Sequence, residues 1–178
     1  VPAITASYSG FVNGDNAASL TTAPTCTTTA TASSPAGTYG TICSGAVDPN
    51  YSFSYVAGTL TVTAVPLTIT ASSGSFTYGG TPPSITASYS GFVNGDNAAS
   101  LTTPPTCSTT ATSSSSVGSY PSTCSGAVDS NYSISYVAGT VTVNTAALTI
   151  TASSPSKVYG AAVPSITASY SGLSLIHI

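Results

Sequence analysis

The chain has 178 residues, of which one is basic, Lys157, and four are acidic, all of them aspartates. Charged residues make up 3% of the sequence, against about 25% in an ordinary soluble domain. A single basic residue cannot neutralise a phosphate backbone or form the polybasic patch that anionic lipid surfaces attract. The composition therefore excludes nucleic-acid binding and electrostatic membrane docking. The hydrophobic content of 41%, rich in β-branched and aromatic residues, favours folded β structure.

The sequence repeats with a long, fixed period. Residues 4–22 and 85–103 both have the sequence ITASYSGFVNGDNAASLTT, and a third copy starts at Ile166 with ITASYSG. Equivalent positions lie 81 residues apart, as residues 4, 85 and 166 show. Such a period predicts an array of structural modules, so one module and its junction to the next are the units to explain.

Three modules are expected from this period. Residues 1–65 form a β module that lacks its first strand, residues 66–146 form a complete module, and residues 147–172 start a third. The tail 173–178 departs from the repeat and contains the only histidine, His177. The tail resembles a translated sequencing adaptor, so we interpret it as a non-native scar on an internal fragment. A diverged natural C-terminus is the alternative.

Within the complete module, short runs alternate apolar and polar residues, as half-buried strands do. Strands are predicted at 67–71 and 85–89, in a hairpin of 106–112 with 120–127, and in a final hairpin-like pair within 131–143 that bends at Ala138–Gly139. The segment 76–83 is predicted to be a turn-rich connector. Residues 94–97 predict a turn, and residues 98–101 one short helical turn with Asp96 or Asn97 as its N-cap.

About six short strands in 80 residues are enough for one small two-layer core. The expected fold class is therefore mainly β, with tandem head-to-tail modules that each form an immunoglobulin-like β-sandwich. A β-grasp-like fold with one short helical turn at 98–101 is the alternative. The linkers at 62–67 and 143–148 are short, which favours a stiff head-to-tail arrangement.

Two cysteine pairs occupy equivalent positions, Cys26 with Cys43 and Cys107 with Cys124. If the members of a pair face each other in a hairpin, the turn of the first copy falls between Ser34 and Pro35, a good turn sequence. Directly opposed residues on antiparallel strands are close enough for a disulfide. We therefore predict the disulfides Cys26–Cys43 and Cys107–Cys124 and an oxidising compartment. Zinc binding is the competing interpretation, but it lacks ligands at a suitable spacing.

Several short motifs recur in order and at the repeat spacing. They are Leu-Thr-Ile-Thr-Ala at 67–71, Tyr-Gly at 78–79 and 159–160, the ITASYSGFVNGD run, Ala-Gly-Thr-Tyr at 36–39, Asn-Tyr at 50–51 and Val-Ala-Gly-Thr-Leu-Thr-Val at 56–62. Over residues 1–172 the chain resembles the MBG domain of YGX type. The resemblance implies a bacterial secreted or cell-surface protein, often adhesin-like, with no catalytic residues to transfer. The cysteine pair departs from the plain apolar residues of many members.

Candidate sites for chemistry are few. Nucleophilic catalysis needs a base beside the nucleophile, and Lys157 is the only lysine, so we expect no enzyme activity. Calcium would need six to eight oxygen ligands, and the first module offers few carboxylates for it. These candidate ligands are Asn13, Asp15, Asn16, Asp48 and Asn50. We expect no cofactor, with calcium as the alternative.

Repeated tyrosines are the candidate ligand contacts, because a ring face suits the apolar face of a sugar while the hydroxyl stays hydrated. The four considered are Tyr51, Tyr55, Tyr132 and Tyr136. Repeated aromatics in β modules are more commonly core or junction residues. We therefore expect a non-enzymatic spacer array whose partners are neighbouring modules. The alternative is that the modules bind a surface glycan or protein multivalently.

Overall fold

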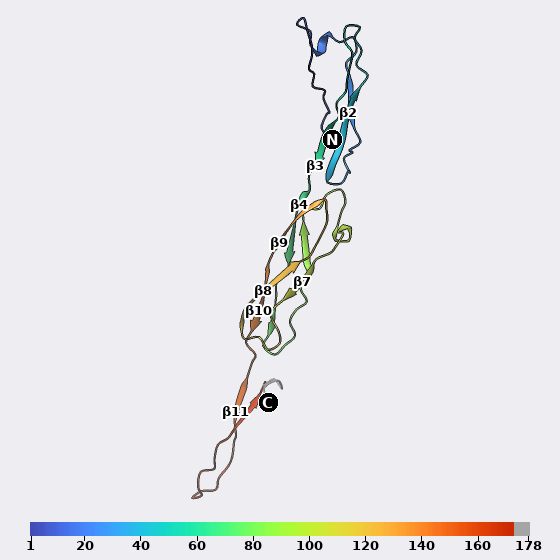
Figure 1. Cartoon of the computed structure of the whole chain (residues 1–178). Coiled ribbons are helices and arrows are strands. Elements are labelled where there is room, and N and C mark those ends of the chain that lie inside the picture. The colour runs from blue at the N-terminus through green and yellow to red at the C-terminus, as the bar shows by residue number, and fades with distance from the viewer. Residues whose placement is uncertain (173–178) are drawn as a thin grey trace. The chain divides into compact units, whose positions relative to one another are not determined.

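The computed structural model describes residues 1–172, so the tail 173–178 and His177 lie outside the described residues. The fold is mainly β, and its helical content in the described part is two short 3-10 turns (Figure 1). The elements are β1 (Thr25–Thr28), β2 (Gly37–Ser44), β3 (Gly58–Val62), β4 (Val65–Ala71), β5 (Gly74–Thr77), β6 (Ala87–Ser90), β7 (Thr106–Thr109), β8 (Gly118–Ser125), β9 (Tyr132–Val137), β10 (Gly139–Asn144), β11 (Thr149–Ala152) and β12 (Ala168–Ser171), with η1 (Ala17–Ser19) and η2 (Ala98–Ser100).

Two compact units make up the chain, and they do not follow the repeat boundaries. The first contains Val1–Leu67, Gly91–Leu101 and Val128–Ser133. The second contains Thr68–Ser90, Thr102–Ala127 and the segment from Ile134 onward. The first unit therefore includes two loop segments of the second sequence repeat. The module boundaries drawn from the repeat stay a prediction.

In the first unit, β1, β2 and β3 form an antiparallel sheet in that order. The strands β1 and β2 are the predicted cysteine hairpin, with Cys26 opposite Cys43. Ala30 is the buried apolar residue of this hairpin. Most other side chains of the sheet are half-buried or exposed, so this sheet lacks a developed core.

The strands of the second repeat form two sheets. One has the order β5-β10-β8-β7, with β5 and β10 parallel, and the other has the order β6-β4-β9. The consecutive strands β4 and β5 lie in different sheets, and so do β9 and β10. Strands that switch sheets at a bend are a feature of sandwiches. This arrangement supports the predicted sandwich, because a grasp fold needs a helix that covers a sheet.

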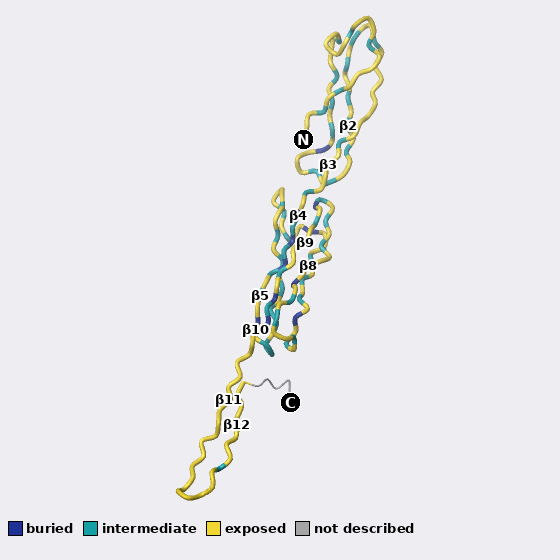
Figure 2. The backbone as a smooth tube through the Cα atoms, turned by 90° about the vertical axis from the view of Figure 1, so that its left-hand side faces the viewer, coloured by how far each residue is buried: buried dark blue, intermediate teal, exposed yellow. Residues whose placement is uncertain are grey.

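The core of the second repeat is small and comes from both sheets. Leu67 and Ile69 of β4 and Val141 and Val143 of β10 are almost fully buried (Figure 2). The hydroxyl of Ser122, also buried, donates a hydrogen bond of 2.7 Å to the carbonyl oxygen of Ser72, so its burial costs little. Because this core is small, a disulfide contributes a larger share of the stability of the repeat.

Several predicted elements are present, and one strand was missed. The helical turn is η2, capped by the Asn97 side chain, which accepts a hydrogen bond from the amide of Ala99. The chain bends between β9 and β10 at the predicted position, but the hairpin-like pair predicted there is wrong, because the two strands lie in different sheets. The segment predicted as a connector from residue 76 instead overlaps β5, because Gly74–Thr77 pairs in parallel with the distant strand β10.

Equivalent segments fold differently in the three repeats. Residues 6–9 and 51–56, the counterparts of β6 and β9, form no strand in the first repeat. Their common partner in the second repeat is β4, the middle strand of its sheet. No described residue fills the place of β4 in the first repeat. The third repeat consists of the β11–β12 pair, which copies the β4–β6 pair in the same register.

Candidate functional site: the cross-linked hairpins and the module junction

Both predicted disulfides are present. Cys26 is bonded to Cys43 and Cys107 to Cys124, and in each pair the Cα atoms lie 4.0 Å apart. Each bond closes a segment with a sequence separation of 17 residues. The cysteines are directly opposed in their hairpins, so the register deduced from turn position is the register of the strands.

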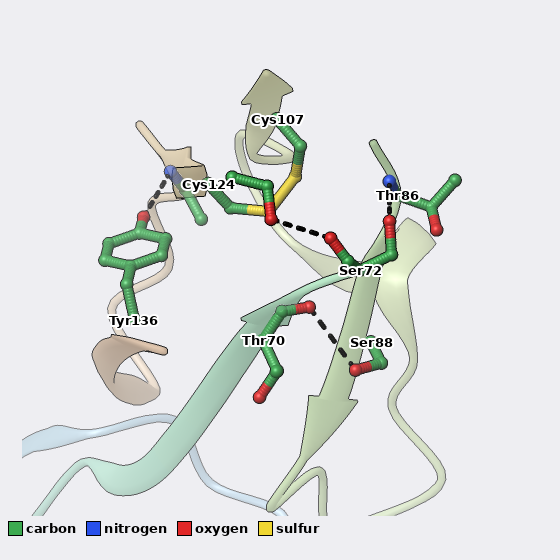
Figure 3. The surroundings of a disulfide bond; sticks show 9 residues. Thr70, Ser72, Thr86, Ser88, Cys107, Cys124 and Tyr136 are labelled. Atoms are coloured by element: carbon green, nitrogen blue, oxygen red, sulfur yellow. Dashed lines mark hydrogen bonds between the residues drawn. A yellow bond between two sulfur atoms is a disulfide. The ribbon is translucent and has the colours of Figure 1, made fainter. Parts of the chain in front are cut away.

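The same backbone contacts surround both disulfides. Thr109 Oγ1 donates to the Pro121 carbonyl and accepts from the Ala111 amide, which closes the turn side of the hairpin. Thr28 makes the corresponding contacts in the first repeat. Beside Cys107–Cys124, the Ser72 hydroxyl accepts a hydrogen bond of 3.0 Å from the Thr86 amide (Figure 3). The surroundings are hydroxyls and backbone groups, and these contacts hold the hairpin in place.

Two of the candidate tyrosines connect loops within their repeats. The Tyr51 hydroxyl lies 2.7 Å from Oδ2 of Asp15, and the Tyr132 hydroxyl lies 2.7 Å from Oδ2 of Asp96. Each hydroxyl also accepts a hydrogen bond from a loop amide, that of Val12 or Val93. These polar groups are satisfied inside the repeat.

The pKa values of both tyrosines are raised above the ordinary tyrosine value. For Tyr51 the main cause is the hydrogen bond to Asp15, which favours the neutral phenol. For Tyr132 the main cause is burial, which disfavours the charged phenolate, and the hydrogen bond to Asp96 raises the pKa further. Because both shifts favour the neutral phenol, each tyrosine keeps its hydroxyl proton and its hydrogen bonds at physiological pH.

The other two candidate tyrosines keep more of their rings exposed. The hydroxyl of Tyr55 accepts a 2.8 Å hydrogen bond from the Ala46 amide, and that of Tyr136 accepts one of the same length from the Ala127 amide. Tyr55 is 45% exposed and Tyr136 is 40% exposed. The structure thus fixes their hydroxyl ends and leaves part of each ring accessible at equivalent positions.

A junction within the first unit joins the two repeats through Asn131. Its side-chain oxygen accepts a hydrogen bond of 2.9 Å from the Ala36 amide in the hairpin turn of the first repeat. Its backbone carbonyl accepts another of 2.9 Å from the amide of Val65, the first residue of β4. Its own amide donates to Asp129, which orients the loop. One asparagine thereby connects the hairpin turn of the first repeat, the start of β4 and a loop of the second repeat.

A pocket of about 510 Å³ lies at this junction, within the first unit. It is lined by the hairpin turn 32–36, by Val62, Thr63 and Val65 where β3 leads into β4, and by Val93, Asn94, Asp96, Asn131 and Tyr132. No sequence pattern predicted this site. The repeat sequence Asn-Tyr-Ser occurs at both Asn50 and Asn131, so this motif does not distinguish the asparagine that lies at the junction.

The candidate calcium ligands are engaged in local structure. Asn13 has a positive φ of 56° in the loop turn, the side chain of Asn16 caps η1, and Asp15 accepts from Tyr51. Asp48 Oδ1 accepts a hydrogen bond of 2.9 Å from the amide of Asn50. Within residues 1–172, no group of three or more His, Cys, Asp or Glu side chains is placed to hold a metal. The expectation of no cofactor, its alternative of calcium, and the expectation of no enzyme activity all stay untested predictions.

The fold and these sites define a class of protein: tandem β modules, each with one disulfide-linked hairpin, joined by short linkers. A model of the MBG domain (YGX type) matches residues 1–61 and matches again at residues 67–142. The chain therefore belongs to the MBG domain family of YGX type, and the tandem repeat is confirmed. Comparison with curated proteins and with solved structures gives no significant match. Over the described part of the chain, no helix has the length and hydropathy needed to cross a membrane.

Proposed function

We propose that this chain is a non-enzymatic spacer array of a large bacterial surface protein of the adhesin-like kind. The family match supports a repeat-array role, and two disulfides favour an extracellular or otherwise oxidising environment. In this role the modules transmit tension and hold a distal binding region away from the cell.

The observation that carries the proposal is the double contact of Asn131 at the junction. A flexible tether needs no contact between a linker and its neighbouring modules. Here the turn amide of Ala36 in the first repeat and the amide of Val65, the first residue of β4, both donate to the same asparagine of the second repeat. Each bond contributes about 1 kcal/mol, so the two together restrict the junction without making it rigid against large forces.

The test is the distribution of distances between the two repeats, measured with a dye pair on the exposed equivalent positions Thr27 and Ser108. Labels are attached through unnatural amino acids, so the cysteines stay paired. We expect one narrow distribution, which Asn131→Ala broadens. Asn50→Ala is the matched control, because Asn50 holds the equivalent repeat position and precedes the same Tyr-Ser pair but makes no junction contact among the described residues. A broad distribution in the unmodified chain, or no response to Asn131→Ala, argues against the spacer.

A second candidate function rests on the exposed rings of Tyr55 and Tyr136. One such ring lies at the equivalent position of each of the first two repeats. An aromatic ring can bind a sugar weakly, and several equivalent rings on one chain can bind a glycan more tightly together. The test is binding of the whole chain to an immobilised panel of glycans. We expect the double variant Tyr55→Ser and Tyr136→Ser to lose at least about tenfold in apparent affinity relative to either single variant. If the unmodified chain retains no glycan, the spacer function stands alone.

A further inference from the structure

The pocket at the repeat junction, which we call the junction pocket, contains a negative charge that no basic side chain of its unit balances. Asp96 is the acidic residue among those that line it. The three segments of the first unit contain all four aspartates of the sequence and no lysine, arginine or histidine. A cationic group on a ligand is therefore attracted to this unit.

One carboxylate oxygen of Asp96 is engaged within the chain, and the other is free for a ligand. Oδ2 accepts the 2.7 Å hydrogen bond from the Tyr132 hydroxyl, and among the described residues Oδ1 makes no hydrogen bond. Within residues 1–172 no buried side-chain oxygen or nitrogen lacks a hydrogen-bond partner, so Oδ1 is accessible to solvent. The carboxylate therefore offers a single oxygen to an incoming group.

The loop that contains Asp96 is held in place by its own hydrogen bonds. The Asp96 amide donates a 3.0 Å hydrogen bond to the Val93 carbonyl, and Asn94 between them has a positive φ of 57°. The Tyr132 hydroxyl fixes the carboxylate itself. A site whose groups are already in place binds a ligand without a large ordering cost.

The rest of the junction pocket combines apolar and neutral polar groups. Three valines line it, Val62, Val65 and Val93, and so do two serines of the hairpin turn, Ser33 and Ser34. The volume of about 510 Å³ lies within the range of small-ligand pockets, roughly 300–1,000 Å³. A ligand that combines a positive charge with an alkyl stem suits both parts of this lining.

We propose that the junction pocket binds the side chain of a lysine on a partner protein, that is, a protonated primary amine on an unbranched alkyl stem. The ammonium group donates a hydrogen bond to Oδ1 of Asp96 and further ones to the serine hydroxyls, while the stem packs against the valines. An ammonium group has three donors and no acceptor, so it can use each of these oxygens. Its methylene groups favour apolar surface even where its charge stays hydrated.

The lining favours lysine over other classes of ligand. A guanidinium group pairs best with both oxygens of a carboxylate, but Oδ2 of Asp96 is occupied by Tyr132. A neutral sugar leaves the negative charge of the pocket uncompensated, and an anion is repelled by it. Lysine binding goes beyond the spacer function, which needs no ligand, so its failure would leave the distance measurement between the repeats unaffected.

The test is an NMR titration of the whole isotope-labelled chain with Nα-acetyl-lysine N-methylamide. We expect saturable shifts of the amide signals of Ala36, Val93 and Asn94, and weaker binding as salt is added. The Nε-acetylated probe keeps the stem but loses the charge, so it should bind at least about tenfold more weakly. The arginine equivalent should also bind more weakly than the lysine probe.

Two variants show whether the carboxylate of the pocket is responsible. Asp96→Asn removes the charge but keeps an oxygen for the Tyr132 hydroxyl, and it should weaken binding of the lysine probe about tenfold. Asp15→Asn is the matched control, because Asp15 lies in the identical sequence 4–22 and accepts the same hydrogen bond from Tyr51 but does not line the pocket. This control should bind like the unmodified chain, and spectra without probe check the fold of each variant.

Several results would overturn the proposal. They are the absence of saturable shifts, equal binding of the lysine and Nε-acetylated probes, and equal loss of binding in the two variants. Calcium ions that shift the same amides where the lysine probe does not would assign the pocket to a metal instead. If n-butylamine, which has the stem and the charge without a peptide backbone, binds more tightly than the lysine probe, the partner is a free amine and not a protein.

Discussion

Tyr51 and Tyr132 hold equivalent loops in the first two repeats, but different surroundings raise their pKa values. Tyr51 depends first on its hydrogen bond to Asp15, and Tyr132 depends first on burial. Tyr132 is more buried because β9 pairs with β4, whereas the segment that contains Tyr51 has no such partner. The same residue type at one repeat position is thus buried in the second repeat and half-buried in the first.

Alkaline pH should destabilise the chain through these two tyrosines. A folded-state pKa above the ordinary value of about 10 means that the stabilisation is complete below that pH and is lost as pH rises through the raised pKa. We expect the melting temperature to hold steady up to about pH 9 and to fall above about pH 10. Asp15→Asn should shift the tyrosinate absorbance titration of Tyr51 to lower pH by more than Asp96→Asn shifts that of Tyr132. Equal shifts would show that burial does not distinguish the two sites.

At the scale of elements, the bend between β9 and β10 depends on a glycine that has no room for a side chain. A Cβ at Gly139 would lie 2.6 Å from the carbonyl oxygen of Ala71 and from Oγ of Ser122, and 2.7 Å from the carbonyl oxygen of Ser72. Two of these atoms belong to the backbone, so they cannot rotate away. The close approach allows the chain to pass from the sheet that contains β9 to the sheet that contains β10.

Gly139→Ala should therefore destabilise the second repeat by about 1–3 kcal/mol, the usual cost of overpacking. Gly58→Ala is the matched control at the equivalent position, where the added Cβ meets Oγ1 of Thr41 at 2.8 Å, the end of a side chain that can rotate. Denaturant unfolding of the two variants measures the difference. A larger loss for Gly58→Ala would mean that the strand crossing is not tightly packed.

The two disulfides also stabilise the fold at the scale of elements. Closing a loop of about 15 residues contributes about 3 kcal/mol in the chain-entropy model, and each bond here has a sequence separation of 17. We expect the double variant Cys107→Ala and Cys124→Ala to lower the free energy of unfolding of the second repeat by about 3 kcal/mol. Denaturant titration measures it, with dithiothreitol-treated native chain as the comparison. A loss below about 1 kcal/mol would leave the strand contacts as the main restraint.

Local patterns predicted much of this fold. The cysteine register, the capped turn at Asn97 and the bend before Gly139 all follow from turn residues and alternation within about 20 residues of sequence. The strand β5 was missed because its four residues are paired with β10, far along the chain, and no short-range pattern encodes that pairing. The absence of strand at residues 51–56 has the same origin, since their sequence closely matches β9 and only the partner differs.

The junction contact could not be predicted from the sequence. The amide of Ala36 and the side chain of Asn131 are 95 residues apart in sequence. Asn50 is followed by the same Tyr-Ser pair as Asn131 but lacks this contact. Only the fold shows which asparagine joins two repeats, so the junction could be found from structure and not from the motif.

At the scale of the whole molecule, we propose that the chain is an array of disulfide-linked β modules that bear tension along the chain. Under tension, a disulfide removes the residues it encloses from the extensible length. With a separation of 17 residues and about 3.5 Å per extended residue, each intact bond shortens the extension of its repeat by roughly 60 Å.

Single-molecule stretching of the whole chain tests this claim most directly. We predict stepwise unfolding in which reduction lengthens the extension step of the second repeat by roughly 60 Å and lowers the force at which it unfolds. A smooth extension without steps, or step lengths that do not change on reduction, would contradict the claim that cross-linked modules bear the tension.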